Sequence, residues 1–307
     1  MYKNFFNIRD IPFAVVPDIK FYCSLPSHEE AVQSILHSLS IGDSLITVTG
    51  EIGVGKTLVC KKVLSSLEQD NLICHIPNPS FGTDDLYRSI LQQFNHEKST
   101  DTARFDLLKS IQEEALKYKK DNKNVVLVID ESQLMNAPML ESVRLLTNLE
   151  HNSEKLIQVI LFGQPELDEQ LQRKDLRQFA QRIVFKYKIR TLSYEECSHY
   201  LIHRLVAAGH ATGGLFSPKA IKVLHKYSQG VPRIINILAH KAMMFSYSRN
   251  TLQIDTQAVK AAVKDSPNVV SSIYYTDSKN SQLVKVLTIV TVSLLFFFFG
   301  LVLTLGI

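Results

Sequence analysis

One short stretch, residues 50–57, constrains the fold of this chain more than any other. Its sequence Gly-Glu-Ile-Gly-Val-Gly-Lys-Thr matches the phosphate-binding loop pattern G-x-x-x-x-G-K-S/T in full. An apolar, β-branched run at 44–49 precedes it, and residues 58–67 carry apolar side chains at helical spacing. A strand, a glycine-rich loop and a helix in this order predict an α/β fold that binds a nucleotide phosphate chain at the loop.

The residue types of this loop indicate how it would bind its ligand. Glycines allow backbone N–H groups to point at phosphates, and the helix N-terminus adds a favourable dipole. Lys56 is expected to reach the β- and γ-phosphates of ATP, and the Thr57 hydroxyl to bind Mg²⁺. The residues expected to contact the nucleotide are Gly50, Glu51, Ile52, Gly53, Val54, Gly55, Lys56, Thr57 and Leu58.

A second predicted strand ends in two acidic residues. Residues 124–129 form a continuous apolar run, typical of a strand buried on both faces of a parallel sheet, and Asp130 and Glu131 follow it. Because the carboxyl ends of parallel strands meet at one edge, this pair is expected beside the loop. Asp130 would hold Mg²⁺ and Glu131 would activate water as general base, so the predicted chemistry is ATP hydrolysis. An isolated Asp-Glu pair would instead be an ordinary helix cap.

Three more strands complete a predicted five-stranded parallel sheet, at residues 71–76, 155–162 and 183–189. Gln164 follows the second of these strands. Its side chain either hydrogen-bonds the attacking water or the γ-phosphate, or Gln164 is simply a turn residue beside Pro165. Arg177 and Arg182 precede the last strand. They are either solvated surface charges or arginine fingers that reach a neighbouring subunit's γ-phosphate.

The pattern becomes helical after residue 190. Amphipathic stretches at 194–208, 218–227, 234–247 and 256–263 predict a small α-helical lid. Arg233 stands at a helix start, where it can touch the nucleotide from this lid. The predicted domains are a P-loop core at 1–190, a lid at 191–265 and a polar linker at 266–283. The core begins with an aromatic strap at 4–24, which forms either an adenine pocket or simple core packing.

The end of the chain predicts a membrane anchor. No charged residue occurs from Val286 to Ile307. A helix rising about 1.5 Å per residue can cross a hydrocarbon core about 30 Å thick over this length, which predicts a transmembrane helix at 284–306. Lys279 and Lys285 precede the uncharged run, and no secretory signal opens the chain. The positive-inside tendency therefore places the preceding body in the cytoplasm, at the inner membrane.

Composition narrows the classes of protein to which this chain can belong. Hydrophobic residues make up 45% and charged residues 21% of the chain, as in globular proteins with a good core. The net charge of +4 is mild and implies no global attraction to nucleic acid. The scattered cysteines form no C-x-x-C pair and indicate reduced, packed thiols: Cys23, Cys60, Cys74 and Cys197.

In the order of its parts the chain resembles an AAA+ ATPase, and within that class the family of the general secretion pathway protein A (ExeA), which includes the pilus biogenesis ATPase MshM. The resemblance covers roughly residues 4–265. The stretches that carry it are residues 12–13, 17–18, 21–22, 28–31, 50–57, 128–134, 145–150, 163–167, 176–183, 203–209 and 230–236.

This resemblance implies a Walker A motif at 50–57, a Walker B motif at 125–131, a first sensor at Gln164 and a second at Arg233. It favours Arg182 over Arg177 as the finger. It also implies a homo-oligomer, such as a ring, and partners among the secretion or pilus assembly proteins of the inner membrane. Fuller members carry a periplasmic peptidoglycan-binding module after their membrane span, whereas this sequence stops at the span, so a tail-anchored ATPase module is expected.

Two other functions stay open. A DNA-associated regulatory ATPase of the transposition type would need a basic stripe facing the pore of an oligomer. The run Arg182, Lys186, Lys188 and Arg190 is partly basic, but alternating lysines on a strand are more often simply solvated. A nucleotide-dependent scaffold would bind ATP without turnover. The predicted membrane span makes nucleic acid the less expected partner.

Overall fold

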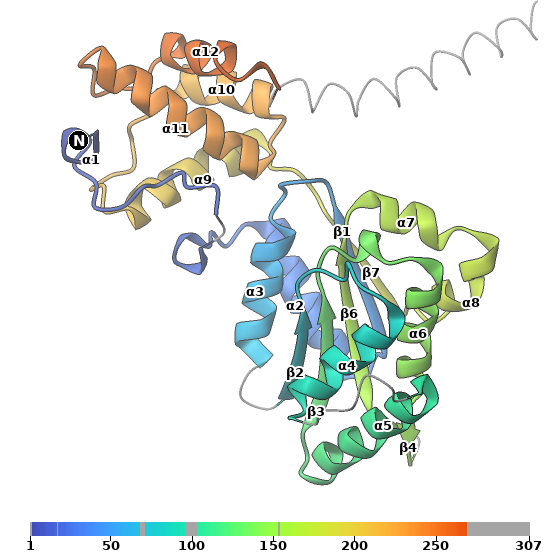
Figure 1. Cartoon of the computed structure of the whole chain (residues 1–307). Helices are drawn as coiled ribbons and strands as arrows, with labels where there is room; N and C mark the ends of the chain where they lie inside the picture. Colours follow the sequence, from blue (N-terminus) through green and yellow to red (C-terminus); the bar gives the residue numbers. More distant parts are fainter. Residues whose placement is uncertain (1, 17, 68–70, 96–102, 153, 269–307) are drawn as a thin grey trace, which may run out of the picture.

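A parallel five-stranded sheet forms the centre of the larger domain (Figure 1). The computed structural model describes residues 2–16, 18–67, 71–95, 103–152 and 154–268. The strands follow the order β2-β3-β6-β1-β7, and every pairing is parallel. Their bounds are β1 (Leu45–Gly50), β2 (Asn71–Ile76), β3 (Asn124–Ile129), β6 (Ile157–Gly163) and β7 (Phe185–Ile189). The predicted sheet is therefore confirmed.

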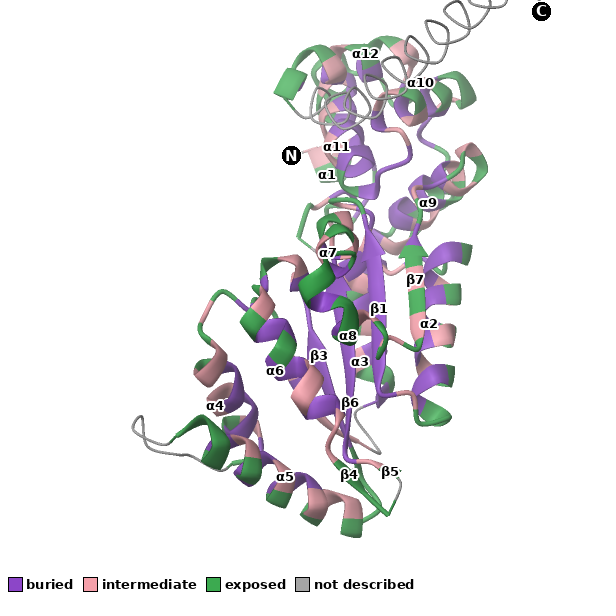
Figure 2. Cartoon of the chain, turned by 90° about the vertical axis from the view of Figure 1, so that its right-hand side faces the viewer, coloured by how far each residue is buried: buried purple, intermediate pink, exposed green. Residues whose placement is uncertain are grey.

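Strand burial explains why the apolar runs were visible in the sequence. β1 and β6 are buried along their whole length, and β3 is buried from its second residue (Figure 2). The edge strand β7 alternates instead, with Lys186 and Lys188 exposed. Because β6 lies between β3 and β1, the residues that follow these three strands emerge side by side at the carboxyl edge of the sheet.

Each face of the sheet is covered by its own helices. One hydrophobic cluster joins α2 and α3 to alternate strand residues such as Val48, Val128 and Ile160. The other joins α4 to α8 to the intervening residues, such as Leu127, Val159 and Leu161. The helices are α2 (Pro26–Ser40), α3 (Lys56–Leu67), α4 (Thr83–Gln93), α5 (Arg104–Lys120), α6 (Ala137–Thr147), α7 (Pro165–Leu171) and α8 (Arg177–Ala180), with 3₁₀ turns η2 (Ser132–Leu134) and η3 (Lys174–Leu176).

A helical domain follows the last strand and has a hydrophobic cluster of its own. It consists of α9 (Tyr194–Ala207), α10 (Pro218–Ser228), α11 (Pro232–Ser248) and α12 (Thr256–Lys264). Ser193, Ser217 and Asp255 cap three of these helices through side-chain hydrogen bonds to backbone N–H groups. These caps explain why the helix starts were predictable from the sequence.

The N-terminal strap packs with this helical domain. Phe6, Ile8, Phe13 and Phe21 are buried in its cluster, although they precede the sheet in the sequence. The backbone N–H of Arg9 donates to the carbonyl of Ala208 at 2.7 Å. Among the described residues of the strap, only α1 (Tyr2–Phe5) and the 3₁₀ turn η1 (Ile19–Phe21) are regular. The strap is therefore ordered, mainly extended chain on the surface of the second domain.

Some elements differ from the prediction. The strand expected at 155–162 begins two residues later, as β6, and Lys155 instead belongs to a short antiparallel hairpin of β4 (Glu150–His151) and β5 (Glu154–Lys155), which was not predicted. The short helices α7 and α8 were not predicted. The transmembrane helix predicted at 284–306 lies outside the described residues, as does most of the linker. Within the described ranges, no helix combines the length and apolar character needed to cross a membrane.

Candidate nucleotide-binding site

The loop between β1 and α3 can be built only from glycine at two positions. Gly53 and Gly55 have φ angles of +83° and +108°, a region that other residues rarely adopt. A Cβ atom on Gly53 would lie 2.6 Å from the Cβ of Arg233. One on Gly55 would lie 3.0 Å from Cε1 of His28, whose Nε2 bonds the Val54 carbonyl at 2.8 Å. Helices α2 and α11 thus hold the loop from two sides.

Lys56, the first residue of α3, lies inside the loop. Its Nζ donates to the carbonyl oxygens of Gly50 at 2.6 Å and Glu51 at 3.0 Å, and the residue is only 6% exposed. Burial lowers the pKa of Lys56, an effect that the nearby Glu131 and Asp130 carboxyls oppose. The ammonium is therefore held by uncharged acceptors, which phosphate oxygens can replace.

Thr57 and Asp130 bring a hydroxyl and a carboxyl together. Asp130 is 4% exposed, and its Oδ1 accepts the N–H of Glu131 at 2.9 Å. Its pKa lies above the usual value, because burial raises it more than the hydrogen bonds from the Glu131 N–H and the Thr57 hydroxyl lower it. A hydroxyl beside a carboxyl fits Mg²⁺, which prefers oxygen ligands and would favour the ionised carboxyl.

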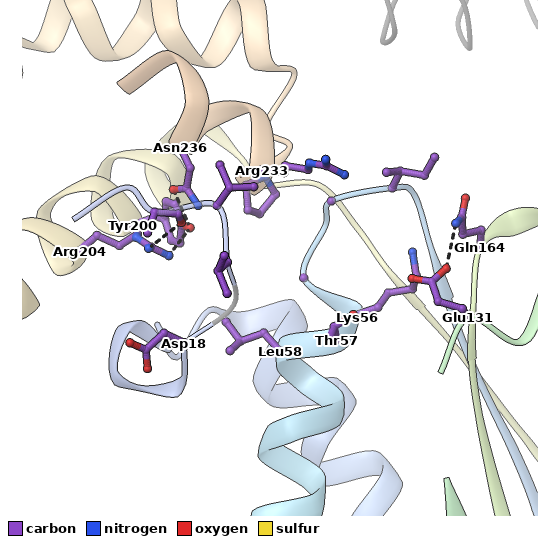
Figure 3. A pocket seen from close by; sticks show the side chains of 17 residues that line it. Asp18, Lys56, Thr57, Leu58, Glu131, Gln164, Tyr200, Arg204, Arg233 and Asn236 are labelled. Atoms are coloured by element: carbon purple, nitrogen blue, oxygen red, sulfur yellow. Dashed lines mark hydrogen bonds between the residues drawn. The ribbon is translucent and has the colours of Figure 1, made fainter. Parts of the chain in front are cut away.

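Glu131 has an unusual backbone and two amide partners. Its φ and ψ of 52° and 36° are left-handed, a strained conformation for a residue other than glycine. Its Oε2 accepts from Nε2 of Gln133 at 2.6 Å. The same oxygen accepts from Nε2 of Gln164 at 3.1 Å (Figure 3). Gln164 stands at the N-cap of α7, directly after β6. The structure therefore joins the predicted base to the predicted first sensor.

A cavity of about 390 Å³ opens between the loop, the strap and the helical domain. At one end lie Lys56, Glu131 and Gln164, and at the other lie Leu58 and Tyr200 (Figure 3). Residues 14–16 of the strap also line the cavity. The first end is polar and charged, as a phosphate chain requires. The second combines apolar surface with polar groups, as a planar base requires.

Comparison with known proteins agrees with this geometry. Residues 40–171 match the family model described as "AAA domain". General secretion pathway protein A from Aeromonas hydrophila is 36% identical over 254 residues, which cover 83% of this chain and 46% of that protein. The chain belongs to the AAA+ family and is related to general secretion pathway protein A. It spans less than half of that relative's length.

Solved structures show the same AAA+ fold at low sequence identity. CDC6P from Pyrobaculum aerophilum matches with a TM-score of 0.62 at 15% identity, over 81% of this chain and 71% of that one. ORC2 from Aeropyrum pernix, in its ADPNP-ADP complexes, matches with a TM-score of 0.59 at 15% identity, over 80% and 70%. RuvB from Thermotoga maritima, a Holliday junction branch migration motor, matches with a TM-score of 0.51 at 16% identity, over 80% of this chain and 73% of that one. These likenesses concern the fold alone.

The helical domain of this AAA+ chain docks directly on the loop. Arg233 is the second residue of α11, and its backbone N–H donates to the Gly53 carbonyl at 3.1 Å. Its side chain lines the cavity. The connection between the domains is fixed nearby, because the N–H of Leu192 donates to the Gly230 carbonyl at 2.9 Å. A Cβ atom on Gly230 would lie 2.1 Å from the Leu192 carbonyl oxygen, so these backbones approach closely.

The structure places the predicted residues in three groups. Those that line the cavity are Ile52, Gly53, Gly55, Lys56, Thr57, Leu58, Glu131, Gln164 and Arg233. Gly50, Glu51, Val54 and Asp130 support these residues without lining it: Gly50 and Glu51 hold Lys56, Val54 is buried, and Asp130 is the partner of Thr57. Arg177 and Arg182 are exposed and do not line the cavity.

Several residues at the cavity were not predicted from the sequence. Asp18, Tyr200, Arg204 and Asn236 line the end away from the loop. The Tyr200 hydroxyl accepts from Arg204 and donates to Oδ1 of Asn236, each at 3.0 Å (Figure 3). Tyr200, Arg204 and Asn236 place polar groups on helices with many buried apolar residues, which is one signal that could have identified them. Asp18, Arg204, Asn236 and Gln133 lie within the stretches that carry the family resemblance, but none of the four was assigned a role.

Proposed function

We propose that this chain hydrolyses ATP with Mg²⁺, as an oligomer at the inner membrane, and thereby drives or regulates the assembly of a bacterial envelope machine. A type II secretion system or a type IV pilus of the MSHA type is the expected machine. The observation that best supports hydrolysis is the meeting of Lys56, the Thr57–Asp130 pair and Glu131 at one edge of the sheet. Binding alone would not require Glu131 there.

Each of these residues has a distinct chemical task in the proposed reaction. Lys56 would exchange its backbone carbonyl partners for the β- and γ-phosphates, and Thr57 with Asp130 would hold Mg²⁺, which would neutralise phosphate charge. Glu131 accepts the proton of the attacking water, and the Gln164 amide orients that water or the γ-phosphate. Arg233 adds positive charge from the helical domain. A nucleotide-dependent scaffold would need Lys56, Thr57 and Asp130 to bind the nucleotide, but it would not need Glu131 and Gln164 to act on the attacking water.

Two substitutions test this proposal. Lys56→Ala is expected to lose nucleotide binding, whereas Glu131→Gln is expected to bind ATP without turnover, because only the base is removed. Binding of ADP and release of phosphate measure the two effects separately. Glu113→Gln, the same change on the exposed surface of α5, serves as the matched control. If Glu131→Gln turned over ATP at the rate of the unmutated protein, the assignment of the base would be wrong.

The envelope partner and the membrane location rest on different observations. The relative's name, general secretion pathway protein A, supports the envelope role, and the apolar residues 286–307 support the anchor. Membrane fractionation of the chain with and without residues 284–307 tests the anchor. Equal amounts of both forms in the membrane fraction would contradict it. A DNA-associated regulator would need no such anchor, so the same experiment separates the two functions.

A further inference from the structure

One glutamine side chain connects the ends of two strands at the nucleotide site. Gln133 lies in the 3₁₀ turn η2, just after β3. Its Nε2 donates to Oε2 of Glu131 at 2.6 Å, and its Oε1 accepts the backbone N–H of Gln164 at 3.0 Å. A single amide group therefore bridges the carboxylate that follows β3 and the peptide that follows β6.

The orientation of this amide is determined by its partners. A carboxylate accepts and a backbone N–H donates, so the amide nitrogen must face Glu131 and the amide oxygen must face Gln164. The backbone of Gln133 is held as well, because its carbonyl accepts from Nε2 of Gln170 in α7 at 3.1 Å. The turn itself is closed by the Ser132 hydroxyl, which donates to the carbonyl of Ile129 at 2.9 Å.

Glu131 needs such support. Its backbone is left-handed, and its carboxylate lies near the Lys56 ammonium and acts on the pKa of that group. Among the described residues, however, Glu131 forms no ion pair within 4.0 Å; its partners are the two neutral amides of Gln133 and Gln164. Both amides bond Oε2. This arrangement leaves Oε1 as the oxygen that can accept a proton from water.

We propose that Gln133 is a positioning residue that sets the catalytic carboxylate and keeps it away from the loop lysine. The inference rests on the proposed ATP hydrolysis, and it adds a mechanical coupling between the end of β6 and the base Glu131. Because one amide holds both Glu131 and the Gln164 peptide, a shift of the β6 end moves the base. The orientation of the base therefore follows the position of the first-sensor strand.

Two polar substitutions test this role without introducing an apolar group. Gln133→Glu keeps an acceptor for the Gln164 N–H but sets a carboxylate against Glu131. Gln133→Asn keeps the amide but shortens the side chain by one methylene group. Both are expected to lower kcat at least tenfold while the Kd for ADP stays within twofold of the unmutated value. Gln172→Glu, exposed just after α7, is the matched control with the same change of charge.

A coupling measurement distinguishes positioning from a general structural role. Gln164→Leu removes the other amide donor to Glu131, so Gln133→Asn should lower kcat less in that background than in the unmutated protein. Equal kcat losses in both backgrounds, an unchanged kcat in Gln133→Glu, or weaker ADP binding in proportion to the loss of kcat would each overturn the proposal.

Failure of the proposed function gives a different result. If the unmutated full-length chain binds ADP but releases no phosphate from ATP, hydrolysis itself is wrong, and the positioning role falls with it. If the unmutated chain turns over ATP and Gln133→Glu and Gln133→Asn do so equally well, only the role of Gln133 is wrong. Phosphate release and ADP calorimetry on the same preparations separate these results.

Discussion

At the scale of single residues, Gly53 combines a left-handed backbone with a close approach of the helical domain. Gly53→Ala is therefore expected to cost more stability than Gly42→Ala. Gly42 has a φ of +88° but nothing within 4 Å of an added Cβ, so this variant isolates the backbone cost of about 1 kcal/mol. At Gly53 the added Cβ would lie 2.6 Å from that of Arg233. The displaced Arg233 should also weaken ADP binding at least tenfold.

Urea unfolding and ADP calorimetry on both glycine variants measure these effects. Gly214→Ala, at a position without positive φ and 3.5 Å from its nearest neighbour, should change neither quantity. Equal losses of stability in Gly42→Ala and Gly53→Ala, with unchanged ADP binding, would show that the loop does not depend on its contact with Arg233.

Site residues were predictable where their chemistry is local in sequence. Lys56 and Thr57 lie within one loop, and Asp130 and Glu131 lie at the end of one strand, so spacing alone indicates their roles. Gln133 was not predictable, because its amide acts on a residue 31 positions later in the chain. Tyr200 similarly meets Asn236 across 36 positions. No local pattern carries the information about such contacts.

At the scale of elements, Arg204 in α9 fixes the shape of the strap. Its Nε donates to the Pro12 carbonyl, its Nη2 donates to the Ala14 carbonyl at 3.4 Å, and its guanidinium lies 4.8 Å from the centre of the Phe21 ring. Arg204→Met leaves these buried acceptors without donors, so it is expected to lower the free energy of unfolding by about 2–4 kcal/mol. Because residues 14–16 line the cavity, ADP binding should weaken as well.

Urea unfolding of Arg204→Met against Arg249→Met provides the comparison. Arg249 has a side chain 48% exposed and a long contact of 4.0 Å with Asp255, so its loss should change stability by no more than about 0.5 kcal/mol. If the two variants were equally stable and bound ADP equally well, the strap would not depend on Arg204.

The predictability of the elements follows their burial. β3 and β6 are enclosed by helices on both faces, so their apolar runs are unmistakable in the sequence. The hairpin of β4 and β5 consists of charged and polar residues at the surface, so no alternation marks it. The helical domain was predicted from periodicity and caps, but the attachment of the strap to it was not. Aromatic residues show that a segment is buried, without showing against which neighbour.

At the scale of the whole molecule, the exposed arginines before β7 suggest a site completed by a second subunit. Arg182 is exposed beside the β4–β5 hairpin, where Lys155, and more weakly Arg182, lower the pKa of Glu150. Mixtures of Arg182→Ala and Lys56→Ala chains are expected to regain activity that each lacks alone. Random assembly would restore an intact lysine and a neighbouring arginine at about a quarter of the interfaces.

Phosphate release across a series of mixing ratios measures this recovery, and Arg177→Ala replaces Arg182→Ala in a parallel series. Recovery in the Arg177 series alone would transfer the role to Arg177. Activity that never exceeds that of the separate variants in either series would show that neither arginine acts between subunits.

The hydrogen bond between the Arg233 N–H and the Gly53 carbonyl joins the two domains without using a side chain. Every residue except proline supplies that N–H, so exchange of the guanidinium leaves this bond in place. At position 233 the backbone N–H thus attaches the two domains, while the side chain independently sets the charge that faces the nucleotide. Related chains can change the chemistry at this position while they keep the same mechanical connection between lid and loop.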